Sequence, residues 1–130
     1  MNRYRDWLEQ AGYNLRYAEH GANAGYHAWA CFAAHQAGEA ALKGLHLRLG
    51  QVAWGHSLLD LLSSLPESVR PAASLLDNAR ILDKYYIPTR YPDAHPAGPA
   101  SRHYSSDEAI QAICLAREVL DFCEGESVEA

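Results

Sequence analysis

The stretch ACFAAHQAGEAALKGL, residues 30–45, decides the fold that we expect for this chain. It is the middle of a helical pattern that runs from Tyr26 to about Leu49, and its alanines and glycines make the helix unusually thin. Small side chains allow a neighbouring helix to approach closely. The small residues are Ala28, Ala30, Ala33, Ala34, Ala37, Gly38, Ala40, Ala41 and Gly44. We therefore expect other helices to pack tightly against this one.

Apolar residues also recur at helical spacing in two segments on either side, from Tyr4 to about Asn23 and from Ser68 to Tyr86. Pro71 is compatible with the second segment only because it falls in the first turn. Between them, the stretch SLLDLLSSLP predicts a short helix that begins after Ser57 as its N-cap and stops at Pro66. These patterns predict helices throughout.

The last helix is predicted to begin at Ser105, which has the spacing of a capping box with Glu108. No window alternates apolar and polar residues as a strand does. The fold class predicted is therefore all-α: an antiparallel four-helix up-and-down bundle with an additional short helix and a Pro-rich loop before the last helix. We expect one helical domain over residues 1–124 and a frayed acidic tail over residues 125–130.

Length, charge and cysteines limit the class of protein. The chain has 130 residues, the size of one domain, and a formal net charge of -5, which excludes a generally basic surface for nucleic acid. Cys31, Cys114 and Cys123 are an odd number without a C-x-x-C motif, so we expect reduced core thiols. The sequence shows neither a signal peptide nor eighteen consecutive apolar residues, and we expect a cytoplasmic protein with no membrane partner.

Two sets of polar residues on the small-residue helix can be read as sites. His27, Cys31 and His35 follow at every fourth position, as metal ligands on one helix side do, but a cysteine on an Ala-rich helix is more typical of a core. We expect no metal and no cofactor. Glu39 and Lys43, beside Gln36, are interpreted as a solvated face with an ion pair rather than as a site.

The loop YYIPTRYPDAHPAGPASRHYSS, residues 85–106, carries the best candidates for chemistry. Arg90 and His95 are separated by four residues; a guanidinium holds a phosphate with two hydrogen bonds, and an imidazole transfers protons near neutral pH. Together they are the minimum for metal-independent RNA cleavage, so they are the predicted catalytic residues. The alternative is a purely structural loop in which Arg90 pairs with Asp93 or Asp83.

The order of four sequence blocks resembles a known family. ACFAAHQAGEAALKGL, HSLLDLL, LDKYYIPTRYPDA and YSSDEAIQAICLAREVLDFC follow one another as in the HEPN domain family, specifically its small prokaryotic stand-alone members with an IPTRYPDA-like loop. The resemblance implies a homodimer in which two copies of the loop surround one shared cleft. The small-residue helix is also too apolar to be covered by the other helices alone, and the tryptophans exceed what a small core needs. These tryptophans are Trp7, Trp29 and Trp54.

The resemblance implies one function and leaves two alternatives. The first is a nucleotide- or RNA-binding protein that acts with a minimal nucleotidyltransferase in a toxin–antitoxin-like pair. The alternatives are a metal-independent endoribonuclease toxin that uses Arg90 and His95, and a non-catalytic dimeric interaction module. The family's ribonucleases carry R-x4-6-H, whose spacing this chain keeps, but Pro92 and Pro96 exclude the helical setting of that motif, and Tyr91 and Ala97 replace residues found in toxin members.

The expected ligand is a nucleotide or single-stranded RNA, and DNA is not expected. Tyrosine rings in the loop can stack on unpaired bases, and the basic residues near the start of the last helix can add local positive charge, helped by open N–H groups at Ser105 and Ser106. The predicted nucleotide-binding residues are Tyr86, Arg90, Tyr91, Asp93, Arg102, His103 and Tyr104.

Overall fold

The computed structural model describes residues 2–129, and the side chains of residues 2–126. Its helices are α1 (Tyr4–Asn23), α2 (His27–Arg48), α3 (Leu58–Ser63), α4 (Ala73–Asp83) and α5 (Ser106–Glu129), with two short 3₁₀ turns, η1 (Pro92–Ala94) and η2 (Ala100–His103), between α4 and α5. No strand occurs in the described part of the chain. The all-α prediction is therefore confirmed.

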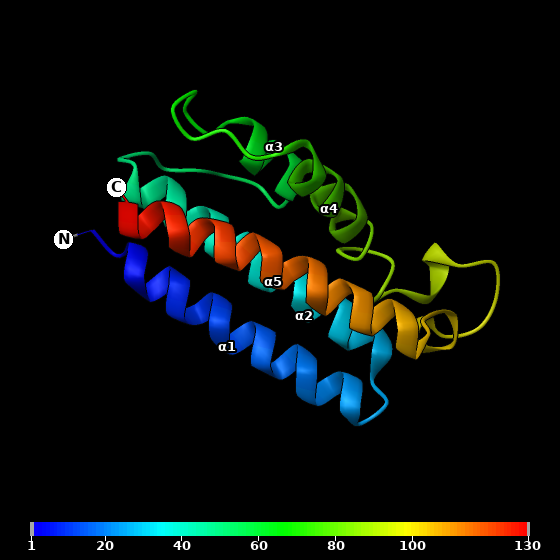
Figure 1. Cartoon of the computed structure of the whole chain (residues 1–130). Helices are drawn as coiled ribbons and strands as arrows, with labels where there is room; N and C mark the ends of the chain where they lie inside the picture. The colour runs from blue at the N-terminus through cyan, green and yellow to red at the C-terminus, as the bar shows by residue number, and fades with distance from the viewer. Residues whose placement is uncertain (1, 130) are drawn as a thin grey trace.

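The three long helices α1, α2 and α5 lie side by side, and α3 and α4 form a shorter layer on top of them (Figure 1). Helix α2 contacts each of the other helices. Both chain ends lie at one end of this bundle, whereas the loop that joins α4 to α5 projects from the other end (Figure 1). The loop that carries the predicted site residues thus lies at one end of the molecule.

The small residues of α2 allow the close packing that the sequence predicts. Most of the helix is buried, and a Cβ added at Gly44 would lie 3.0 Å from Trp7 Cβ and 3.1 Å from the Tyr4 carbonyl oxygen of α1. A Cβ added at Gly38 would lie 2.8 Å from a methyl group of Leu58 in α3. Glycine at these two positions sets how closely α1 and α3 approach α2.

The helix predicted over residues 68–86 is shorter than expected. Helix α4 begins at Ala73, because its N-cap Ala72 has an extended conformation, with φ -65° and ψ 154°. Pro71 in addition disfavours helical backbone at Arg70, the residue before it. Pro71 therefore precedes the helix and does not lie in its first turn. At the other end α4 stops at Asp83, and residues 84–90 form turns that lead into the loop.

Both predicted N-terminal caps are present. Ser57 accepts a hydrogen bond from the Asp60 N–H at the start of α3, and Ser105 and Glu108 form the reciprocal capping box of α5. The backbone of α5 remains helical as far as Glu129, so residues 125–129 continue this helix. The last residue of the predicted tail, 130, lies outside the described residues, and the fraying of the tail stays a prediction.

The cysteines and tryptophans differ in their burial. Cys31 and Cys123 are buried as predicted, and burial, with repulsion from Glu108, raises the pKa of Cys31 to about 12. Cys114 is exposed, so its prediction as a core thiol is wrong. Trp7, Trp29 and Trp54 are 37, 48 and 85% exposed.

No helix in the described residues is long and apolar enough to cross a membrane.

We predict that Gly44→Ala destabilises the protein by about 1 kcal/mol. Alanine has the better helix propensity, but its Cβ forces α1 and α2 apart, and the loss of packing is larger than the gain in propensity. Gly12→Ala is the matched control in α1, since its Cβ would meet only Arg16 Nη1, at 3.5 Å, and it should be neutral or stabilising. Urea unfolding of both variants measures the difference. Equal stability of the two variants would show that close packing at Gly44 is not required.

Candidate functional site around Arg90

Asp83, the last residue of α4, connects three helices. Its Oδ1 accepts hydrogen bonds from the Leu58 N–H at 2.7 Å and from His35 Nε2 of α2 at 3.2 Å. Its Oδ2 accepts from the Ser57 hydroxyl at 3.0 Å and the Leu59 N–H at 3.2 Å. The carboxylate thus satisfies the free N–H groups at the start of α3 and orients a buried histidine of α2.

These hydrogen bonds determine the charge state of Asp83. Burial by itself raises the pKa of this carboxyl, but the four donated hydrogen bonds outweigh burial and hold the pKa below its ordinary value. Asp83 is therefore a carboxylate at neutral pH. The end of α4 is fixed in position, and with it the path of the chain into the loop.

Tyr86 lies three residues after Asp83 and is the first ring of the site. The ring of His56 stacks on it at 4.7 Å between centroids and 18° between planes, and the ring of His35 lies 5.0 Å away. The Phe32 ring of α2 lies 6.1 Å from it. Tyr86 therefore joins the start of the loop to α2 and to the segment before α3.

Arg90 is held against this group of rings. Its Nε donates to the Tyr86 carbonyl oxygen at 2.8 Å, and its Cζ lies 4.3 Å from the centroid of Phe32, 4.7 Å from that of Tyr86 and 5.3 Å from that of Tyr91. A planar guanidinium stacks well on aromatic faces. Within the described residues its terminal nitrogens have no ion pair or hydrogen bond, so the predicted alternative pairing with Asp93 or Asp83 is wrong.

His95 belongs to a different group of contacts. Its Nε2 donates to the Pro88 carbonyl oxygen at 2.7 Å, and its ring stacks on that of His103 at 4.3 Å and 1°. His103 Nε2 in turn donates to the Ala97 carbonyl oxygen at 2.6 Å, and Tyr104 meets His95 edge-on at 5.7 Å. These contacts shape the loop, and none of them involves Arg90.

The predicted site residues thus fall into two groups. Tyr86, Arg90 and Tyr91 lie together, whereas His95 lies with His103 and Tyr104. Arg102 folds over Gly98, which has a φ of +78° and no room for a Cβ beneath the guanidinium. Asp93 is exposed in η1.

The start of α5 offers less to an anion than predicted. The Ser105 N–H donates to the Glu108 carboxylate at 3.1 Å, and the Glu108 N–H donates to the Ser105 hydroxyl at 3.1 Å. The capping box therefore uses the N–H of Ser105 that we expected to be open. The carboxylates of Asp107 and Glu108 also place negative charge in this turn.

Three residues that the sequence analysis did not include in the site are connected to Tyr86: His56 stacks on its ring, Glu39 bonds to His56, and Lys43 bonds to Glu39. Glu39 is 8% exposed, and its carboxylate bonds to His56 Nδ1 at 2.9 Å and to Lys43 Nζ at 3.1 Å. The interpretation of Glu39 as part of a solvated face is therefore wrong, although its ion pair with Lys43 is present. Two features of the sequence could have indicated this group: Glu39 and Lys43 are four residues apart on one helix, and His56 directly precedes SLLDLL.

The histidines of α2 do not form a metal site. His35 bonds to Asp83 and, through Nδ1, to the Gln36 side-chain oxygen at 3.1 Å. No group of three or more His, Cys, Asp or Glu side chains that could hold a metal ion occurs in residues 2–126.

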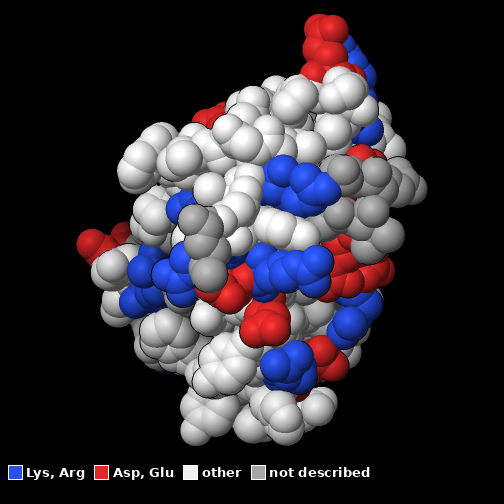
Figure 2. Space-filling view, turned by 90° about the vertical axis from the view of Figure 1, so that its left-hand side faces the viewer, with Lys and Arg blue, Asp and Glu red and all other residues white. Residues whose placement is uncertain are grey.

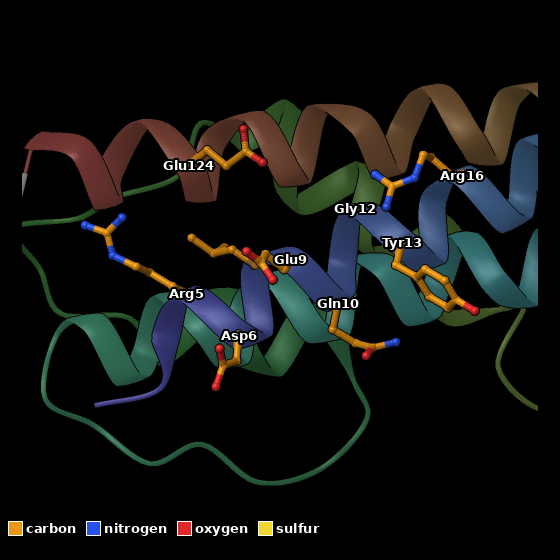
Figure 3. Close-up of a pocket in the computed structure, with 9 residues that line it drawn as sticks. Arg5, Asp6, Glu9, Gln10, Gly12, Tyr13, Arg16 and Glu124 are labelled. Carbon is orange, nitrogen blue, oxygen red and sulfur yellow. The ribbon is translucent and has the colours of Figure 1, made fainter. Parts of the chain in front are cut away.

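A surface groove of about 710 Å³ lies elsewhere, between α1 and the C-terminal part of α5. Arg5 and Arg16 lie at its two ends, with Glu9 and Glu124 between them (Figure 3). At the end of the bundle with both termini, basic and acidic side chains also alternate (Figure 2). Neither region offers the single sign of charge that an anionic ligand needs.

Comparisons with known proteins agree over nearly the whole chain. The family model described as the HEPN domain matches residues 4–126. The crystal structure of TT1696 from Thermus thermophilus is 64% identical, covers 97% of this chain and 99% of its own, and has a TM-score of 0.96. No curated protein matches the chain.

Two further solved structures are more distant. ST0689, an archaeal HEPN homologue, is 35% identical, with coverage of 98% of this chain and 99% of its own and a TM-score of 0.83. An HEPN domain protein from Thermotoga maritima is 35% identical, with coverage of 92% of this chain and 95% of its own and a TM-score of 0.75.

We predict that Asp83→Asn lowers the free energy of unfolding by about 1–3 kcal/mol at neutral pH, because the amide cannot accept all the hydrogen bonds of the carboxylate. The folded pKa of Asp83 lies below the unfolded value of about 3.9, so its stabilisation is complete above that pH and is lost as the pH falls. The difference between wild type and variant should shrink below about pH 4.

Urea unfolding at several pH values tests this prediction. The control is Asp77→Asn in the same helix, because that exposed carboxylate pairs only with Arg80 on the surface and should contribute less than about 0.5 kcal/mol. A constant difference for Asp83→Asn between pH 3 and pH 7 would contradict the prediction.

Proposed function

Since the chain belongs to the HEPN domain family, we propose that it binds a nucleotide or single-stranded RNA at Arg90 and acts beside a minimal nucleotidyltransferase in a toxin–antitoxin-like pair. The observation that carries the binding site is the way Arg90 is held. One edge of the guanidinium is fixed by the Tyr86 carbonyl and its face by aromatic rings, which leaves the terminal nitrogens for a ligand. A phosphate takes two parallel hydrogen bonds from such a group.

Aromatic surface beside Arg90 supports the same ligand class. Tyr91 is 46% exposed and contacts the guanidinium, and Trp29, 48% exposed, meets Phe32 edge-on at 5.9 Å. Exposed rings next to a phosphate-binding group offer stacking faces for unpaired bases. Because the whole chain carries a formal charge of -5, the attraction for an anion is local to Arg90.

A homodimer completes the proposal. HEPN domains are often dimeric, and the exposed tryptophans supply apolar surface that a second copy can cover. In the dimer that the family resemblance implies, the two Arg90 side chains would lie around one shared cleft. The third hypothesis, a non-catalytic interaction module, requires no ligand at this cleft.

We predict that Arg90→Ala weakens binding of nucleotide or short single-stranded RNA about 10- to 100-fold, since it removes a charged pair of hydrogen bonds. Arg90→Lys should bind at an intermediate level, because lysine keeps the charge but loses the planar fork. Arg70→Ala is the control, because Arg70 is exposed and pairs with Glu67 on the surface. Calorimetric titration at two salt concentrations measures these affinities, and unchanged binding in Arg90→Ala would place the site elsewhere.

We predict that the isolated protein does not cleave RNA through Arg90 and His95. The Nε2 of His95 is committed to the Pro88 carbonyl, and its ring is stacked on His103, away from the contacts of Arg90. Proton transfer in catalysis needs both groups on one phosphodiester. Single-stranded RNA incubated without metal should stay intact with wild type and with His95→Ala. Cyclic-phosphate ends that disappear in His95→Ala would contradict this prediction and favour the ribonuclease alternative.

A further inference from the structure

Next to the Tyr86 ring that Arg90 contacts, the exposed imidazole is that of His56, whereas His35 is buried and His95 lies with His103. The ring of His56 and the guanidinium of Arg90 each lie 4.7 Å from the centroid of the Tyr86 ring. The two groups are therefore no farther apart than twice that distance. A ligand bound to Arg90 through a phosphate therefore needs to span at most twice 4.7 Å to reach His56.

His56 is oriented by a buried carboxylate. Its Nδ1 lies 2.9 Å from Glu39 Oε1, and because a carboxylate only accepts hydrogen bonds, Nδ1 carries the proton. The Glu39 side chain is 10% exposed, whereas that of His56 is 55% exposed. The other ring nitrogen, Nε2, has no hydrogen bond within the described residues and is available to a ligand.

Lys43 makes this arrangement compatible with an anionic ligand. Its ammonium group bonds to Glu39 Oε2 at 3.1 Å, so the charge of the carboxylate is balanced within the protein. A bound phosphate at Arg90 therefore does not face an uncompensated negative charge behind His56.

The chemistry of Nε2 indicates which part of a nucleotide it takes. With the proton on Nδ1, the neutral imidazole presents Nε2 as an acceptor, and a phosphate diester has no proton to donate to it. A ribose hydroxyl both donates and accepts, so it bonds to Nε2 in either protonation state of the ring. The 2′-hydroxyl is also the group that distinguishes RNA from DNA.

We propose that His56, oriented by Glu39, binds the 2′-hydroxyl of a ribonucleotide whose phosphate is held by Arg90. This inference rests on the proposed function and adds to it the selection of ribonucleotides over deoxyribonucleotides. His56 is the contacting residue, and Glu39 is a positioning residue that acts through it.

The test compares a single-stranded oligoadenylate with its deoxy counterpart of the same length. Wild type should bind the RNA about tenfold more tightly, because the DNA lacks one hydrogen-bonding group. His56→Phe keeps a ring to stack on Tyr86 but has no nitrogen, so it should bind the two oligomers equally and at the wild-type level for DNA. Glu39→Gln should reduce the preference, and His20→Phe, which replaces a histidine in the last turn of α1, should leave it unchanged.

A measurement on wild type alone avoids the question of whether the variants fold. The imidazole nitrogen resonances of His56 should shift on addition of the RNA and remain in place on addition of the DNA. Equal affinity of wild type for RNA and DNA, or a ribose preference that survives in His56→Phe, overturns the inference but leaves the Arg90 site standing. Absence of binding to either oligomer overturns the proposed function and this inference together.

Discussion

The Asp83 carboxylate is the interaction on which the site depends. It caps α3, holds His35 of α2 and ends α4, and so fixes three helices relative to one another at one point. Tyr86 follows one turn later, and Arg90 is tied to the carbonyl of Tyr86. The direction of the guanidinium is therefore set by a chain of contacts that begins at a partly buried charge, not by the loop alone.

The helices could be predicted from the sequence because their causes are local. Periodic apolar residues indicated α1 and α2 almost to the residue, and the caps at Ser57 and Ser105 depend only on neighbours three positions away. The start of α4 was placed too early because the apolar pattern continues through residues 68–72, whereas Pro71 constrains the backbone there. Periodicity describes which face is buried, but it does not determine at which residue the backbone becomes helical.

The site could be predicted only in part, because spacing along the chain does not determine direction. Arg90 and Tyr91 were identified by residue type, and they do lie together. The spacing of Arg90 and His95 suggested a pair, but a hydrogen bond to Pro88 turns His95 toward His103. His56 and Glu39 are 17 positions apart and meet only because α3 packs on α2, which no local pattern reports.

The hydrogen bonds that shape the loop join residues that are close in sequence. Thr89 bonds to the carbonyl of Tyr85, Arg90 to that of Tyr86, His95 to that of Pro88 and His103 to that of Ala97, all within seven positions. Closing such short segments costs little chain entropy. The internal shape of the loop therefore depends mainly on its own residues, whereas its start is anchored to the bundle through Tyr86 and Arg90 on Phe32. Mutations in the half of the bundle that carries the chain ends are thus expected to leave that internal shape unchanged.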